Sequence, residues 1–314
     1  MSILGRVRRR GRGLQGPIVT GALGGSGTRA IAQAFGELGV YMGGKLNPAY
    51  DNLWFTLLVK RPRWLPRRLA GKRPSPEIVE ALRVFEAIMT GGNLDRERIG
   101  LLADAAADMA AWGHDDRKAR KGAGAFRLPA SALNAKPPKS GWWGWKEPHS
   151  HIVLPELVST FPDLRYVHVL RHPLDMAFSD NKTDLRLWAP SFGVTPPGDG
   201  GIGDSNAQLR WWVRSAEMAS ANAAALGDRF TFVRFEELCS DPATTLRGVC
   251  DAFGLDASDE ELGRAAAHVE TPKSTGRWRQ HPWQELDPEL IVAAGRFGFD
   301  VPATRTRVEE GAAS

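Results

Sequence analysis

Short apolar runs alternate along this chain with longer segments in which apolar residues recur every three or four positions. The short runs are rich in β-branched and aromatic residues, as in strands of a buried sheet, and the longer segments have the period of amphipathic helices. Strands that alternate with helices favour an α/β fold in which a parallel β-sheet of about four to five strands carries helices on both faces. The expected strands are residues 18–22, 40–42, 142–146, 166–170 and 230–235. The expected helices are residues 28–38, 48–59, 76–89, 95–112, 152–159, 173–188, 206–226, 242–253, 258–268 and 287–297.

The same pattern predicts a single domain over residues 16–302 with unstructured ends. Residues 1–15 contain five arginines and no acidic residue, so we expect a disordered arm there, and a disordered tail over residues 303–314. Two internal stretches, residues 113–140 and 189–205, are polar and contain several glycines and prolines. We expect mobile surface loops in both.

The composition of the chain excludes several classes of function. The chain has 314 residues with 41 Lys and Arg against 36 Asp and Glu, and the positive excess resides in the N-terminal arm. The remaining residues are balanced in charge, which argues against a nucleic-acid interface. No apolar run approaches the roughly 20 residues that span a bilayer, and no apolar stretch follows the arginines as it would in a secretory signal. With Cys239 and Cys250 expected to be reduced, the expected location is the cytoplasm.

The sequence VTGALGGSGTRA, residues 19–30, is typical of a strand, a glycine-rich turn and the start of a helix. Glycines let the backbone approach a ligand closely, and the first amides of a helix favour a bound anion. The loop of nucleotide hydrolases carries a Lys before its Ser or Thr. No Lys stands here, so either another cation assists or the turn binds nothing. The candidate anion ligands are Gly24, Gly25, Ser26, Gly27, Thr28 and Arg29.

Two more cations follow predicted strands. Lys146 and Arg171 each stand at the end of a strand, and Ser179 follows Arg171 by eight residues. Because ligands bind at the carboxyl ends of the strands in open α/β sheets, these side chains are expected at the same edge as the glycine-rich loop. The structural alternative is that both cations pair with carboxylates close in sequence: Glu147, Asp175 or Asp180.

Taken in order, five segments resemble the sulfotransferases that use 3′-phosphoadenosine 5′-phosphosulfate (PAPS). They are GGSGTR, WKEPHSHIVLPEL, LRHPLDMAFSDN, VRFEELCSDPATTL and GRWR. The resemblance runs from about residue 17 to residue 299, with no motif between residues 62 and 140. It implies a P-loop-like three-layer α/β fold, a bacterial member of the family, and transfer of a sulfuryl group from PAPS, which leaves 3′-phosphoadenosine 5′-phosphate (PAP).

The resemblance implies a role for each matching segment. GGSGTR would hold the 5′-phosphosulfate, and Lys146 would lie near the sulfuryl group. Arg171 and Ser179 would hold the 3′-phosphate, and Phe235 would lie beside the adenine. The residues that would close over the nucleotide are Gly276, Arg277, Trp278 and Arg279.

The chain also departs from the pattern of the family. Gly25 stands where many members carry a loop Lys, so Arg29 and Lys146 would supply the charge. The Arg-Lys-Gly triplet of the cytosolic animal enzymes is missing, and Lys273 and Arg277 are its possible stand-ins. The histidine base of those enzymes would align near Pro148, so the resemblance does not identify the base.

Sulfuryl transfer needs cations around the transferred group and a base for the proton of the acceptor. The candidates for the base are Asp51, His149 and Glu147, of which Asp51 and His149 are preferred. No metal ion is expected, because the loop would hold a phosphosulfate in place of a hydrolysed triphosphate. The acceptor is expected to be a small molecule, lipid or carbohydrate, and the tryptophans of residues 142–145 form either core or the rim of its cleft. The alternatives are a nucleotide-binding protein of this kind without transfer activity, and a P-loop kinase.

Overall fold

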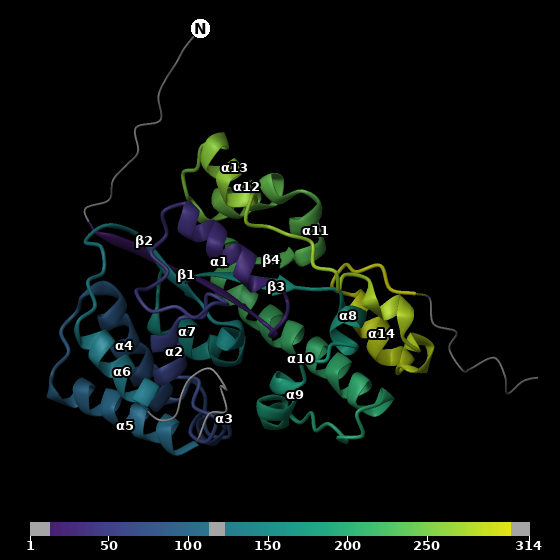
Figure 1. Cartoon of the computed structure of the whole chain (residues 1–314), viewed down its shortest axis with the longest axis horizontal. Coiled ribbons are helices and arrows are strands. Elements are labelled where there is room, and N and C mark those ends of the chain that lie inside the picture. Colours follow the sequence, from purple (N-terminus) through teal and green to yellow (C-terminus); the bar gives the residue numbers. More distant parts are fainter. Residues whose placement is uncertain (1–12, 113–122, 303–314) are drawn as a thin grey trace, which may run out of the picture.

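A computed structural model of the chain describes residues 13–112 and 123–302. The predicted tail and the first twelve residues of the predicted arm lie outside this description. Within it, four parallel strands form one sheet in the order β2-β1-β3-β4 (Figure 1). They are β1 (Leu14–Ala22), β2 (Gly141–Lys146), β3 (Arg165–Leu170) and β4 (Phe230–Arg234). The parallel sheet of the predicted α/β fold is thus confirmed.

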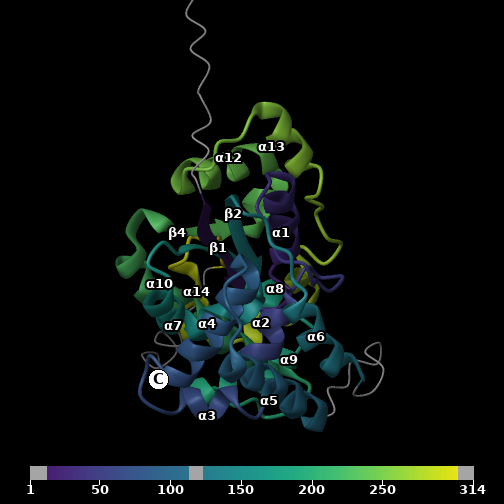
Figure 2. The same cartoon turned by 90° about the vertical axis from the view of Figure 1, so that its left-hand side faces the viewer.

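Helices pack on both faces of this sheet (Figures 1 and 2). One face carries α1 (Thr28–Glu37), α11 (Phe235–Ser240), α12 (Pro242–Phe253) and α13 (Asp259–Ala266). The other carries α2 (Leu53–Leu58), α4 (Pro76–Thr90), α7 (Leu154–Thr160) and α10 (Ile202–Leu226). The remaining helices are α3 (Leu65–Leu69), α5 (Arg96–Trp112), α6 (Ala123–Leu133), α8 (Pro173–Ala177), α9 (Thr183–Leu187) and α14 (Pro288–Gly295), and the 3₁₀ turns are η1 (Pro148–Val153), η2 (Ala189–Phe192), η3 (Gly227–Arg229), η4 (Arg277–Gln280) and η5 (Trp283–Glu285). Among the helices of the described ranges, none has the length and apolar character needed to cross a membrane.

Alternate residues of β1 enter two different hydrophobic cores. Ile18 packs with the helices on one face and Val19 with those on the other, and both are fully buried. This follows from the twofold alternation of side chains along a strand. Trp143 and Trp145 lie deep in the second core, so the predicted tryptophan cluster is core and its interpretation as the rim of a cleft is wrong for these two residues.

Two expected elements near the start of the chain are shorter than the pattern predicts. Residues 40–42 form a single bridge, Tyr41 to Trp143, in place of a strand. The helix expected from residue 48 begins only at Leu53, because Asn52 caps it by accepting hydrogen bonds from the first helical amides. The preceding turn holds Tyr50 in the left-handed region, at φ 64°, which no helix tolerates.

The helix expected over residues 173–188 is broken in two. α8 ends at Ala177, and the next residues form a turn in which the hydroxyl of Ser179 accepts from the Asn181 amide and the Asn181 side chain accepts from the Thr183 amide. Such bonds from Ser and Asn side chains to nearby amides compete with helical ones. Ser179 therefore lies in a turn, and its expected place inside the helix of residues 173–188 is wrong.

The two predicted loops contain more regular structure than expected. The stretch 113–140 includes α6, whose Ser131 accepts a hydrogen bond from the Trp54 indole at 2.9 Å, while residues 113–122 lie outside the described ranges. The stretch 189–205 includes η2 and the first turn of α10. The mobility of both stretches remains a prediction.

Candidate active site

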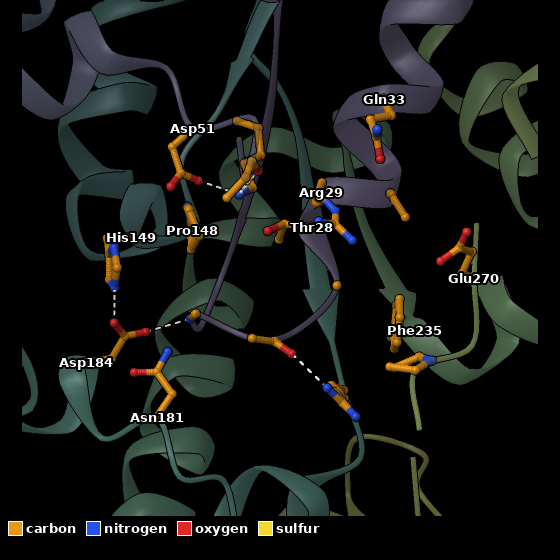
Figure 3. A pocket seen from close by; sticks show the side chains of 18 of the residues that line it. Thr28, Arg29, Gln33, Asp51, Pro148, His149, Asn181, Asp184, Phe235 and Glu270 are labelled. Atoms are coloured by element: carbon orange, nitrogen blue, oxygen red, sulfur yellow. Dashed lines mark hydrogen bonds and ion pairs between the residues drawn. The ribbon is translucent and has the colours of Figure 1, made fainter. Parts of the chain in front are cut away.

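A cleft of about 650 Å³ opens at the carboxyl ends of the strands (Figure 3). Each strand contributes residues that follow it directly: the glycine-rich loop after β1, Lys146 at the end of β2, Arg171 after β3 and Phe235 after β4. The predicted site residues that line the cleft are Gly24, Gly25, Gly27, Thr28, Arg29, Asp51, Lys146, His149, Arg171 and Phe235. The sheet therefore gathers most of the predicted site at one edge, as the position of these residues at strand ends implies.

The glycine-rich loop turns sharply between β1 and α1. The amide of Ser26 donates to the Leu23 carbonyl at 3.2 Å, and the Ser26 side chain is buried away from the cleft surface. Gly25 and Gly27 adopt positive φ angles of 90° and 87°, which L-residues rarely adopt. A side chain on Gly27 would also overlap the ring of Phe235. The loop thus delivers the free amides at the start of α1 to the cleft, where an anion is favoured.

Lys146 forms an ion pair with Asp51 and donates to the Ala49 carbonyl at 2.9 Å. The second carboxylate oxygen of Asp51 accepts from the Asn47 side chain at 2.9 Å. The left-handed Tyr50 turns the chain so that the carbonyl before it and the carboxylate after it reach the same ammonium group. The predicted structural alternative for Lys146, a pair with Glu147, is therefore not what the structure contains.

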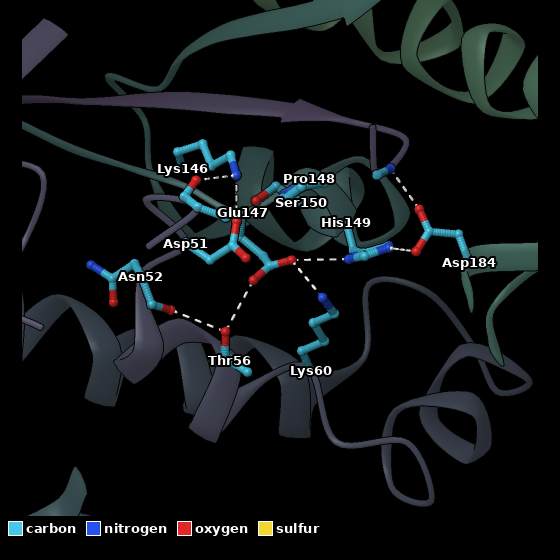
Figure 4. A network of polar contacts seen from close by, with 12 residues as sticks. Asp51, Asn52, Thr56, Lys60, Lys146, Glu147, Pro148, His149, Ser150 and Asp184 are labelled. Atoms are coloured by element: carbon cyan, nitrogen blue, oxygen red, sulfur yellow. Dashed lines mark hydrogen bonds and ion pairs between the residues drawn. The ribbon is translucent and has the colours of Figure 1, made fainter. Parts of the chain in front are cut away.

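Glu147 instead belongs to a buried network of charged groups behind the cleft (Figure 4). One of its oxygens accepts from the Lys60 ammonium and faces Nδ1 of His149, both at 2.9 Å, and the other accepts from the Thr56 hydroxyl at 3.0 Å. Nε2 of His149 lies 2.6 Å from the carboxylate of Asp184. The imidazole ring thus lies between two carboxylates.

Burial and neighbouring charges act on these groups in opposite directions. Burial alone would lower the pKa of His149, but the Asp184 and Glu147 carboxylates outweigh it, and the pKa is raised above the ordinary value. Burial alone would raise the pKa of Asp184, but the charge of His149 lowers it to about 2. Burial would also raise the pKa of Glu147, and the Lys60 ammonium together with His149 holds it well below its usual range. The carboxylates of Glu147 and Asp184 are therefore favoured, and the imidazolium form of His149 is favoured relative to a free imidazole.

Arg171 lines the cleft and is only 6% exposed. Its guanidinium donates to the Gly25 carbonyl at 3.1 Å and to the Ser274 hydroxyl at 2.9 Å, and it lies over the ring of Phe235. The Nε atom of Arg171 is buried and has no partner among the described residues. Burial lowers the pKa of this guanidinium below its usual range, although Asp175 opposes the shift. A buried cation with an unused donor is suited to an anionic ligand.

The remaining predicted residues do not line the cleft. Asp175 accepts from the amides of Gly276 and Trp278 at 2.7 and 3.1 Å, so the carboxylate that could have paired with Arg171 anchors the C-terminal loop instead. That loop reaches Arg171 through Ser274. The predicted ligands outside the lining are Ser26, Ser179, Gly276, Arg277, Trp278 and Arg279, together with the base candidate Glu147.

Several lining residues were not predicted from the sequence, and Asp184 and Lys60 are the most important of them. Both contact groups that are more than 80 positions away along the chain, Asp184 through Gly24 and Lys60 through Glu147. Nothing in the local pattern around either residue signals these contacts. The other lining residues not predicted are Ala30, Gln33, Ala49, Pro148, Asn181, Thr183, Ala267, His268, Glu270 and Pro272.

Within residues 13–112 and 123–302, no group of three or more His, Cys, Asp or Glu side chains is arranged to hold a metal ion. The expectation that the reaction needs no metal remains a prediction.

Comparisons with known proteins agree with the resemblance. A family model described as the sulfotransferase family matches residues 41–259. A search of curated proteins finds no match. The sulfotransferase domain of the Synechococcus PCC 7002 olefin synthase is 18% identical, with 94% of this chain and 98% of that chain covered and a TM-score of 0.46.

Two further solved structures show a similar degree of likeness. Sulfotransferase STF9 from Mycobacterium avium is 15% identical, with 93% of this chain and 79% of that chain covered and a TM-score of 0.47. A retinol dehydratase in complex with androsterone and the inactive cofactor PAP is 17% identical, with coverage of 90% and 79% and a TM-score of 0.41. Likenesses at these scores are too distant to carry an argument about function.

Proposed function

Because the chain belongs to the sulfotransferase family, we propose that it transfers a sulfuryl group from PAPS to a hydroxyl or amine of an acceptor. The observation that carries this proposal is that a glycine-rich loop before a helix and a guanidinium, both suited to anions, line one cleft. In the proposal, the glycine-rich loop with the start of α1 is the first anion site, and the guanidinium of Arg171 is the second. Two such sites suit a nucleotide that carries phosphates at both its 3′ and 5′ positions.

In this proposal the loop residues Gly24 to Arg29 hold the 5′-phosphosulfate and Arg171 holds the 3′-phosphate. Phe235, which packs against Gly27 and lies under Arg171, offers its ring to the adenine. Lys146 supplies a positive charge beside the sulfuryl group, in place of the loop Lys that Gly25 replaces. These assignments agree with the positions of the side chains at the ends of β1, β2, β3 and β4.

The transfer step breaks the bond between sulfur and the bridging oxygen of the 5′-phosphate and forms a bond between sulfur and the acceptor oxygen. Negative charge grows on the departing PAP, so cations and amides around it lower the barrier. The acceptor proton goes to a base, and we assign that role to Nε2 of His149. Glu147 is fully buried and does not line the cleft, and Asp51 is the carboxylate partner of Lys146, whereas His149 lines the cleft and its other ring nitrogen is oriented by Glu147.

PAP and PAPS are expected to raise the melting temperature of the protein without added Mg²⁺. Binding to the folded state alone stabilises it by about 2.7 kcal/mol at about 100 times the dissociation constant. Differential scanning fluorimetry with PAP, PAPS and ATP–Mg²⁺ tests this, and labelled PAPS with an acceptor panel tests transfer. Strong stabilisation by ATP–Mg²⁺ with no effect of PAP would favour a kinase, and PAP binding without transfer would favour a nucleotide-binding protein.

The lining of the cleft favours a polar acceptor, and we propose a carbohydrate in preference to a lipid. The lining around His149 includes the polar residues Asp51, Lys60, Asn181, Thr183 and Asp184 as well as Pro148, and Phe235 at the nucleotide end is the only large apolar residue among the described residues that line the cleft. Charged and amide side chains lose hydration without compensation against an apolar ligand, whereas sugar hydroxyls replace that hydration.

Sugar acceptors are therefore expected to give a higher kcat/KM than long-chain or polycyclic alcohols. Replacing Thr183 by Val keeps the shape of the side chain and removes its hydroxyl. The variant should lower kcat/KM for sugars by roughly 10-fold, which is the loss expected for one unmade hydrogen bond. The affinity for PAP should not change. Thr160→Val, in α7 and away from the cleft lining, is the control. A preference for apolar alcohols would contradict the carbohydrate assignment and leave sulfuryl transfer intact.

A further inference from the structure

Asp184 occupies a position between two parts of the site that the sequence gives no reason to connect. It is the second residue of α9, is only 6% exposed, and lines the cleft. One of its oxygens accepts from the Gly24 amide at 2.6 Å, and the other lies 2.6 Å from Nε2 of His149 (Figure 3). A single carboxylate therefore joins the first amide of the glycine-rich loop to the proposed base.

The lack of a side chain at Gly24 leaves room for the Asp184 carboxylate. Unlike Gly25 and Gly27, Gly24 does not adopt a left-handed φ, so its backbone would accept an L-residue without strain. A Cβ atom there would lie 2.8 Å from the nearer oxygen of Asp184, and its three nearest atoms would all belong to the Asp184 carboxylate. Within the protein, it is Asp184 that leaves no room for a side chain at this position of the loop.

The charged groups around His149 determine how its contact with Asp184 affects the protonation of the ring. The ring faces Glu147 from the segment after β2, Asp184 from α9, Lys60 from the segment after α2, and His151 from η1. Because each ring nitrogen has a carboxylate as its neighbour, both nitrogens are assigned a proton. An imidazolium cannot accept the proton of an acceptor. Nε2, the nitrogen that could do so, is engaged by Asp184.

We propose that Asp184 is a positioning residue that ties the glycine-rich loop to His149, and that this link must open at His149 before the ring can act as a base. The inference rests on the proposed function, because it takes His149 as the base for transfer. When the link opens, the Nε2 proton leaves to solvent through the cleft, and neutral His149 then takes the proton of the acceptor hydroxyl as the sulfur–oxygen bond forms. Asp184 keeps the Gly24 amide in place throughout.

A double-mutant cycle with Gly24→Ala and Asp184→Ala tests the contact itself. Gly24→Ala alone is expected to weaken PAP binding by on the order of 10-fold, because the new methyl group displaces the loop from Asp184. In the Asp184→Ala background the same change should cost much less, because the oxygen that it meets is gone. Calorimetry with PAP measures all four proteins, and melting curves check that each one folds. Additive losses would overturn the link between the loop and Asp184.

The isosteric Asp184→Asn variant tests the effect on the base without depending on transfer. It removes the nearer negative charge from His149, so the NMR titration of that ring should move to lower pH, and the acidic limb of kcat/KM should move in the same direction. Asp180→Asn, exposed and four residues earlier, is the matched control and should move neither. An unchanged His149 titration in Asp184→Asn would overturn the inference. Absence of PAP binding in the wild-type protein would instead remove the proposed function and leave the titration result standing.

Discussion

Replacing Lys146 by Ala is expected to reduce turnover by about 10²–10³-fold, the usual cost of losing one contact that stabilises charge in a transition state. The affinity for PAP should change little, because the ammonium matters most while negative charge develops on the departing group. In the resting protein this ammonium is paired with Asp51 and the Ala49 carbonyl, so it is already fixed beside the cleft. Steady-state kinetics with PAPS and calorimetry with PAP measure the two quantities separately.

The Lys146→Ala result needs a control for the partner that it leaves behind, because Asp51 would lose its cation. The Lys146→Ala, Asp51→Asn double variant removes both charges and should be no more active than Lys146→Ala, while any loss of stability caused by an unpaired Asp51 should recover in it. Lys45→Ala, on the exposed part of the same segment, should behave as the wild-type protein. A loss of PAP affinity that matches the loss of turnover would contradict the assignment, since Lys146 would then act in ground-state binding.

Arg171→Ala is expected to weaken PAP binding by roughly 10–100-fold and to change the affinity for adenosine 5′-phosphosulfate only slightly. The second ligand lacks the 3′-phosphate that the guanidinium is proposed to bind, and a charged hydrogen bond contributes more than a neutral one. Ser179→Ala should have a much smaller effect, because Ser179 lies in the turn after α8 and does not line the cleft. Calorimetry with both ligands on the three proteins tests the difference.

Arg171 also makes contacts within the protein, to Gly25 and Ser274, so a loss of stability must be separated from a loss of recognition. Arg171→Lys keeps the charge and loses the planar fork, and it should recover part of the affinity for PAP. Arg234→Ala, at the end of the neighbouring β4 and half-exposed, is the control for removing an Arg at a strand end. Equal weakening of both ligands with a lower melting temperature would make Arg171 a structural residue.

The sequence predicts the sheet well and the breaks between helices poorly. The apolar runs that became β2 and β3 are largely buried on both faces and therefore stand out from any helical period. Residues 173–188 keep a helical pattern of apolar positions throughout, yet the side chains of Ser179 and Asn181 bond to nearby amides and end the helix. Such local competition depends on side-chain conformation, which a hydrophobic pattern does not contain.

The candidate site likewise has one part that the sequence predicts and another that it does not. The glycine-rich loop, Lys146 and Arg171 are predictable because each follows a strand, and parallel strands end at one edge of the sheet. Asp184 and Lys60 reach the site from helical segments far away in sequence, and only the packing of α2 and α9 against the cleft brings them there. The same packing decides that Glu147 is a buried support and that His149 faces the cleft.

The order of the strands separates nucleotide binding from the chemical step. The glycine-rich loop and Arg171 follow β1 and β3, the two inner strands, whereas Lys146 ends β2, which lies at an edge and has on its outer side only the bridge to Tyr41 and the amide of Asn52. Edge strands separate from a sheet at a lower free-energy cost than inner ones. Local opening of β2 would therefore leave a chain that retains its nucleotide and has lost its catalytic cation. We expect this edge to open at a lower temperature than the rest of the sheet, which would narrow the range over which a nucleotide-bound molecule is also an active one.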